Sequence, residues 1–104
     1  MRHRHLPAFS LELVQTLVGE GKYRITSSAF EGAASLYLDE DDIVACVLGL
    51  RRSDYDQTLD STAVPGTQQD VYLPRFHGFA IYLKLRLVES TRVVVISFKR
   101  NTSA

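Results

Sequence analysis

Tyrosine, lysine and arginine side chains alternate with apolar ones near the end of the chain, in a pattern that could gather acid–base groups on one surface. Tyr82, Lys84 and Arg86 occupy every second position. The apolar residues that alternate with them are Ile81, Leu83, Leu85 and Leu87. Because successive side chains of a strand point to opposite faces, this alternation predicts a strand with one face on the core. The three polar residues are then expected on the outward face.

A second strand after this one would form a hairpin and bring a further cation to the same face. If residues 89–92 form the turn, with a loop of two or four residues, Tyr82 lies opposite Lys99 and Lys84 lies opposite Ser97. The same register pairs Leu83 with Phe98, Leu85 with Ile96, Leu87 with Val94 and Glu89 with Arg92. A loop of odd length would break this register. The predicted face therefore collects a phenol and two ammonium groups.

Groups of these types match what metal-independent RNA cleavage needs. The 2′-hydroxyl must be deprotonated to attack its own phosphate, the added negative charge must be stabilised, and the leaving 5′-oxygen must be protonated. Tyrosine, lysine and arginine can supply these functions together. The candidates are Tyr82, Lys84, Arg86 and Lys99. The alternative interpretation is an ordinary solvated sheet face without a ligand.

The length and composition of the chain are those of one small globular domain. Of its 104 residues, 45% are hydrophobic and 23% are charged. We expect one domain over residues 1–104, with a core from about 9 to 100 and loosely held ends at 1–8 and 101–104. The longest apolar run is far too short to span a membrane. The only cysteine, Cys46, lies in an apolar segment, which favours a buried hydrophobe over a catalytic thiol and a reducing, cytoplasmic location.

The formal net charge is zero, but the charges are unevenly distributed along the chain. Residues 31–70 carry nine acids against two bases, a balance of −7. Residues 71–104 carry six bases against Glu89 alone, a balance of +5. Phosphate binding draws on an excess of Lys and Arg, so this end is where RNA could bind. The alternative is a dipolar surface without a ligand.

The other ionisable clusters favour structural roles over metal binding. The acids at residues 39–42 directly precede a helical pattern, where carboxylates stabilise unpaired N–H groups, so a helix cap is favoured over a metal site. His3 and His5 lack companion ligands and are interpreted as part of a flexible arm. His77 lies in a predicted turn, either as a base or as a polar surface residue. Because no zinc spacing or phosphate loop occurs, we expect no metal and no cofactor.

Helical patterns come first along the chain and strand patterns second. Helices are predicted over residues 11–18, 27–36 and 43–48, and a short strand over 23–25. Ser10 is placed to cap the first helix, and Ser27 or Ser28 the second. The residues of the second helix expected to face inward are Phe30, Ala33 and Ala34. The order predicts an α+β domain with N-terminal helices packed on a mainly antiparallel sheet formed by the C-terminal half.

A set of short segments, in this order and near this spacing, resembles the MqsR family of bacterial toxins. In the first half they are Leu17-Val18, Gly21, Arg24, Thr26, Ser28-Ala29, Leu36, Leu38-Asp39, Gly49-Leu50 and Ser53-Asp54. In the second half they are Gln69-Asp70-Val71-Tyr72, Pro74-Arg75, Tyr82-Leu83-Lys84 and Ser97-Phe98-Lys99. Each identity is weak alone, but their collinearity from about Leu17 to Lys99 makes chance improbable.

The resemblance implies a RelE-like fold and a metal-independent endoribonuclease that cuts messenger RNA at GCU-like sequences and so arrests growth. It also implies an MqsA-like antitoxin partner, whose own N-terminal domain carries zinc. The family's functional glutamine, tyrosine and lysine fall on Gln69, Tyr82 and Lys99. We expect proton transfer and charge stabilisation from Tyr82 and Lys99, and substrate orientation from Gln69. The residues expected to contact RNA are Arg75, Lys84, Arg86, Tyr72 and Gln57.

Gln57 departs from the family's pattern, which has a functional lysine near this position. Either Arg75, Lys84 or one of the pair Arg51–Arg52 supplies the missing charge, or activity is reduced, or the alignment near Gln57 is shifted by a few residues. This departure motivates a second hypothesis, a catalytically weak or inactive homologue that still captures antitoxin and tunes transcription. Strand alternation also places Gln69 and Tyr72 on opposite faces, so they share a site only if a bulge or strand end intervenes.

Overall fold

The structure, a computed structural model, describes residues 6–102 and has the α+β architecture that the order of the patterns predicts. The helices are α1 (Leu11–Gly19), α2 (Ser27–Ala34), α3 (Glu40–Leu48) and the short 3-10 helix η1 (Arg52–Asp54). The strands are β1 (Tyr23–Ile25), β2 (Tyr55–Asp60), β3 (Gln68–Tyr72), β4 (Arg75–Phe76), β5 (Phe79–Val88) and β6 (Arg92–Arg100). In this part of the chain, no helix is long and apolar enough to cross a membrane. The predicted arm with His3 and His5 lies outside the described residues.

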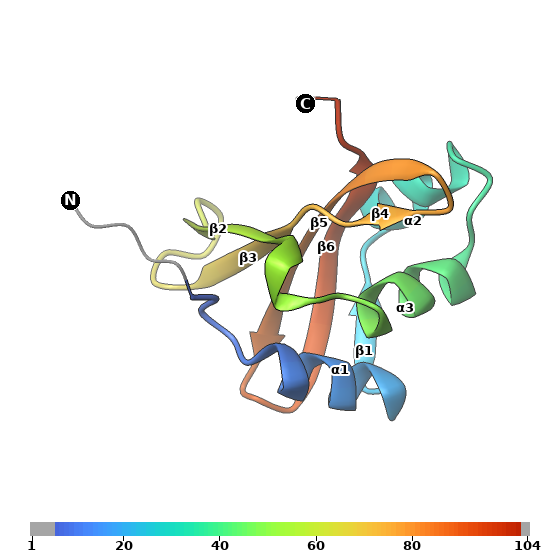
Figure 1. Cartoon of the computed structure of the whole chain (residues 1–104). Helices are drawn as coiled ribbons and strands as arrows, with labels where there is room; N and C mark the ends of the chain where they lie inside the picture. The colour runs from blue at the N-terminus through green and yellow to red at the C-terminus, as the bar shows by residue number, and fades with distance from the viewer. Residues whose placement is uncertain (1–5, 103–104) are drawn as a thin grey trace.

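The strands form one mixed sheet in the order β1-β6-β5-β3-β2, and β4 pairs with β5. Only the pairing of β1 with β6 is parallel; the other pairings are antiparallel. Figure 1 shows α1, α2 and α3 beside the β1–β6 half of the sheet, while the β2–β3 hairpin extends away from them. One face of the sheet packs against α1, α2 and α3 to form the core. The other face has no helix on it within residues 6–102.

The helix starts follow from side-chain caps. Ser10 accepts a hydrogen bond from the Leu13 N–H, as predicted. Asp39 caps α3 in a capping box with Asp42, which confirms the interpretation of residues 39–42 as a cap. The predicted cap of α2 was wrong by one or two residues. Thr26 takes this place, because its hydroxyl accepts from the Ala29 N–H and donates to the carbonyl of a strand residue in β6.

The inward face of α2 differs from the prediction in two of its three residues. Ala33 is fully buried as expected, but Ala34 is exposed and 40% of Phe30 is accessible. The buried residues of this helix are Ala29 and Ala33. The reason is close approach: a Cβ added to Gly32 would lie 2.0 Å from the Phe98 carbonyl oxygen. Only the small side chains of α2 fit against β6, so Phe30 turns outward.

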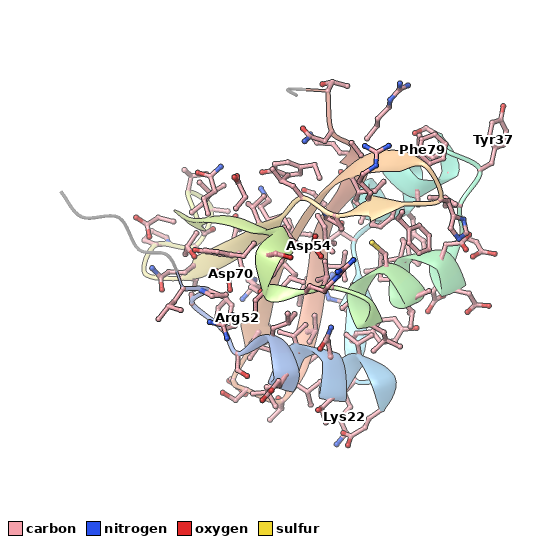
Figure 2. All side chains as sticks on the ribbon, viewed as in Figure 1. Lys22, Tyr37, Arg52, Asp54, Asp70 and Phe79 are labelled. Carbon is pink, nitrogen blue, oxygen red and sulfur yellow. The ribbon has the colours of Figure 1, made fainter. Side chains whose placement is uncertain are left out.

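A buried carboxylate ties the start of the chain to the sheet. Asp70 is fully buried and accepts hydrogen bonds from the Ala8 N–H at 2.9 Å and the Phe9 N–H at 3.0 Å. The Thr58 hydroxyl donates a third at 2.6 Å. In Figure 2, Asp70 lies beside the N-terminal segment. Ala8 belongs to the stretch predicted to be loosely held, and this contact fixes it on β3.

Replacing Asp70 by Ala is expected to destabilise the protein by about 3 kcal/mol, because three donors lose an ionised acceptor. Two of those donors are backbone N–H groups, so the segment up to Phe9 should also detach. Urea denaturation measures the first effect, and limited proteolysis of the folded protein measures the second. Thr58→Val is the matched control, since it removes one donor and leaves both backbone contacts; equal losses in the two variants would contradict this account.

Candidate functional site

The β5–β6 hairpin keeps the predicted register where it matters for the site. Tyr82 lies opposite Lys99, and Lys84 lies opposite Ser97. The prediction was wrong nearer the turn, where Leu85, Leu87 and Val88 pair with Val95, Val93 and Arg92. The loop comprises the three residues between Val88 and Arg92, in which Glu89 and Ser90 have φ angles of 54° and 58°. A loop of odd length shifts the register by one residue.

A β-bulge at Ile96 corrects the shift caused by the loop. The register changes between Lys84 and Leu85, and Ile96 has no partner across the ladder. Thr26 holds the bulge from the other side, because its N–H donates to the Val95 carbonyl and its hydroxyl to the Ile96 carbonyl. The extra residue returns the outer half of β6 to the alternation that β5 requires. Lys99 therefore lies on the face of Tyr82.

The two central side chains are in contact. The Lys99 Nζ lies 5.3 Å from the centroid of the Tyr82 ring, a cation–π distance. Tyr82 is half-buried and Lys99 is exposed, so both reach solvent on an open surface. A phenol that can exchange a proton and an ammonium that can stabilise an anion are thereby held within one substrate's reach.

Strands β3 and β2 add the two glutamines to this face. Gln57 lies opposite Val71, which in turn lies opposite Lys84. Residues paired across neighbouring strands share a face, so Gln57 and Lys84 lie in one row. Gln69 is two residues from Val71 and lies on the same face by alternation. Of the cations that could replace the family's lysine, Lys84 shares the row of Gln57.

The two arginines predicted to contact RNA also lie on this face. Arg86 pairs with Val94 on β6, and Arg75 pairs with Ala80 on β5. Ala80 precedes Tyr82 by two residues, so Arg75 lies on its side of the sheet. One guanidinium nitrogen of Arg75 donates to the Gly78 carbonyl at 3.1 Å, which leaves its other donors free for an anion. We name the surface formed by Arg75, Tyr82, Lys84, Arg86 and Lys99 the basic face.

Tyr72 must be removed from the predicted RNA contacts. It pairs with Leu83, on the helix side of the sheet, and is fully buried in the core. Its ring packs edge-to-face on Tyr55 at 5.7 Å between centroids. The register shift between β2 and β3 at this point leaves the extra residue in β2, between Tyr55 and Gln57, so the alternation that separates Gln69 from Tyr72 in β3 holds. The Tyr72 hydroxyl is buried and has no hydrogen-bond partner among the described residues.

Replacing Tyr72 by Phe is expected to raise the free energy of unfolding by about 1 kcal/mol at neutral pH, because it removes an unpartnered buried hydroxyl. Burial, and then the nearby Asp70 carboxylate, raise the pKa of Tyr72 above its ordinary value near 10. As pH rises above 10, the phenol ionises in the unfolded state but stays protonated in the folded state. The free energy of unfolding of the native protein therefore falls in this pH range. Between pH 10 and 11, the difference in free energy of unfolding between the Tyr72→Phe variant and the native protein should increase by about a further 1 kcal/mol. Urea titrations at pH 7, 10 and 11 measure this; a gap that narrows with pH would contradict it.

Within residues 6–102, none of the cations of the basic face forms an ion pair. Across residues 6–102 there is one ion pair, between Lys22 and Glu20 at 3.2 Å. Several of the acids lie on the helices and at their caps, such as Glu12 on α1 and Asp39, Glu40, Asp41 and Asp42 at the start of α3. In the same range, no three His, Cys, Asp or Glu side chains form a group suited to a metal ion. An excess of unpaired cations on one face is the electrostatic signature of a phosphate-binding surface.

Two further reactive side chains lie away from the basic face. Cys46 is buried in α3, and burial raises the pKa of its thiol to about 12, which suits a packing residue. His77 is exposed in the β4–β5 turn with a φ of 50°, and its ring stacks on Phe76 at 4.0 Å.

The structure places Arg51 and Arg52 on the helix side, beside the start of α1, where Figure 2 labels Arg52.

One positioning residue gave no signal in the sequence. The Cβ that Gly32 lacks would lie 3.2 Å from the Lys99 Cβ as well as against the Phe98 backbone. Gly32 therefore sets how closely α2 approaches the strand that carries Lys99. A single glycine inside a helical pattern is usually a small loss of stability, and nothing local distinguishes this one.

Comparisons with known proteins find one family of similar proteins. A family model described as "Motility quorum-sensing regulator, toxin of MqsA" matches residues 6–100. The "mRNA interferase toxin MqsR" of Escherichia coli (strain K12) is 33% identical over 96 residues, which cover 92% of this chain and 96% of that protein. The family match includes every strand that forms the basic face.

Proposed function

Because this chain belongs to the MqsR toxin family, we propose that it is an mRNA interferase, an endoribonuclease that cuts messenger RNA in the cytoplasm and arrests growth. The observation that carries the proposal is the contact between Tyr82 and Lys99 on an open face with unpaired cations. Its partner would be an MqsA-like antitoxin that holds its own zinc. The sites of cleavage would be GCU-like sequences.

The proposed reaction is an internal transesterification. A general base removes the proton of the 2′-hydroxyl, whose oxygen attacks the adjacent phosphorus while the bond from phosphorus to the 5′-oxygen breaks. The products are a 2′,3′-cyclic phosphate and a 5′-hydroxyl, so the leaving oxygen must gain a proton. Tyr82 exchanges protons in this scheme, and Lys99 stabilises the charge that develops on the phosphate oxygens.

The remaining residues of the face would hold the RNA in place. Arg75 and Lys84 lie one row to either side of Tyr82 along β5 and would bind the phosphates next to the scissile one. Gln69 would orient the substrate through its amide, and Gln57 and Arg86 would contact RNA beside it. These side chains could perform each step without a metal ion, so we propose a metal-independent enzyme.

A second function is favoured by one observation, the neutral Gln57 at the position of a family lysine. A chain that lost this charge could persist as a module that binds antitoxin and tunes transcription without cutting RNA. The row shared by Gln57 and Lys84 favours the enzyme, because Lys84 already supplies a cation there.

Incubation of the purified protein with a long messenger RNA in EDTA tests the two functions directly. The enzyme is expected to give discrete fragments with 2′,3′-cyclic phosphate ends at GCU-like sites, and added antitoxin should suppress them. Intact RNA together with tight antitoxin binding would support the module. Fragments that appear only when a divalent metal is restored would contradict the proposed chemistry.

A further inference from the structure

The basic face continues past the catalytic pair to the far end of the sheet. Arg86 pairs with Val94, and Val94 pairs on its other side with Arg24 of β1. Arg92 pairs with Val88, two residues further along β5. Because paired residues share a face and alternation is regular in this half of β6, both arginines lie on the side of Tyr82.

These two arginines border an open hollow at the edge of the sheet. It has a volume of about 670 Å³ and lies between the β5–β6 turn and the turn that precedes β1. Its lining residues include Arg24, Arg92 and Ser90, and on the helix side Leu17 and Tyr23. Thr91 also lines it, but its hydroxyl donates to the Val88 carbonyl. Guanidinium groups with a hydroxyl donor beside them are suited to bind a phosphate.

The two arginines at this hollow have no anionic partner in the part of the chain that the structure describes. Within residues 6–102, neither Arg24 nor Arg92 makes an ion pair or a side-chain hydrogen bond. Lys22 also lines the hollow, but it pairs with Glu20, and Figure 2 shows it pointing outward from the end of α1. The backbone positions of Arg24 and Arg92 are offset by about 7 Å along the strand direction, because Arg24 lies opposite Val94, two residues after Arg92. Like charges placed near each other repel, and an anion bound by both guanidinium groups would relieve that repulsion.

We propose that this hollow is a distal phosphate site, which binds the RNA strand several nucleotides away from the bond that is cut. The inference rests on the proposed function, since it takes Tyr82 and Lys99 as the point of cleavage. From Tyr82 to Val88 the strand covers about 20 Å, with Lys84 and Arg86 at intervals of about 7 Å between them. On the opposite side of Tyr82, Arg75 is the only cation of the basic face as the described residues define it. The RNA is therefore held over a longer stretch on one side of the cut than on the other.

Binding of short RNAs tests the distal site independently of cleavage. Labelled oligonucleotides centred on one GCU sequence are extended one nucleotide at a time on either side, and their affinity is measured by fluorescence anisotropy on a non-cleaving Tyr82→Phe parent. Affinity should keep rising over several nucleotides on one side only. Adding Arg24→Gln and Arg92→Gln to the parent should abolish the last part of that rise, beyond the nucleotides that Lys84 and Arg86 reach. Two lost phosphate contacts should also make the salt slope shallower by about 1.4, so the parent loses about sevenfold more affinity between 50 and 200 mM salt.

A matched pair of substitutions separates the site from net charge. Arg51→Gln with Arg52→Gln removes the same charge from the helix side and should leave the rise intact. The proposal is overturned if the Arg24/Arg92 variant gains affinity with RNA length as the parent does, or if the parent shows no such gain. Failure of the native protein to cut any RNA would refute the proposed enzyme instead, and the binding series would still decide the distal site.

Discussion

Replacing Tyr82 by Phe is expected to slow RNA cleavage by about 10²–10⁴-fold, the range that a positioned acid or base contributes. The change removes one hydroxyl from a half-buried ring and keeps the surface that Lys99 contacts. Folding and antitoxin binding should therefore be unaffected. Single-turnover cleavage of a GCU-containing RNA gives the rate, and growth of cells that express each variant gives the toxicity.

Lys99→Met completes the same prediction, because it removes the ammonium and keeps the length of the side chain. A loss of about 10²–10³-fold is expected if Lys99 stabilises the developing charge. Arg100→Gln is the matched control. Arg100 is the next cation on β6, but it lies opposite Ile81 on the other face of the sheet, so the variant should cleave RNA at the native rate. Undiminished growth arrest by both Tyr82→Phe and Lys99→Met would remove this site assignment.

Much of the basic face could be predicted from alternation alone. The periodicity of β5 predicts which side chains face outward. The pairing of Tyr82 with Lys99 required only that the predicted register hold in the half of the hairpin away from the turn. The prediction reached the right pair although it assumed a loop of even length. A three-residue loop shifted the register one way, and the bulge at Ile96 shifted it back. Neither feature has a clear local signature, because Glu89 and Ser90 are not the residues that left-handed turns favour.

The errors arose where tertiary contacts decide and local pattern does not. Tyr72 resembles a functional residue by its neighbours in sequence, yet its place in the ladder buries it beside Leu83. Asp70 occupies the core face of the same strand, and an isolated acid at an apolar position was the available sign that it binds donors from elsewhere. The outward turn of Phe30 depends on the distance between α2 and β6, which periodicity does not contain.

Replacing Gly32 by Ala is expected to destabilise the protein by about 2–3 kcal/mol, although alanine favours helices by about 1 kcal/mol. The new Cβ would lie 2.0 Å from the Phe98 carbonyl oxygen, which is backbone inside a paired strand and cannot turn aside. The helix must move away from β6, opening the contacts of Ala29 and Ala33. For a domain of this size the melting temperature should fall by about 10–20 °C.

Gly19→Ala provides the matched comparison, because Gly19 is also a helical residue. Its new Cβ would meet only the Leu48 side chain, at 3.9 Å. That variant should equal or slightly exceed the native protein in stability. Gly32→Ala should also cleave RNA more slowly at temperatures where it is fully folded, because the same Cβ lies 3.2 Å from the Lys99 Cβ and displaces the ammonium from Tyr82. A Gly32→Ala protein with native stability would show that α2 can shift freely, and Lys99 would then owe its position to the hairpin alone.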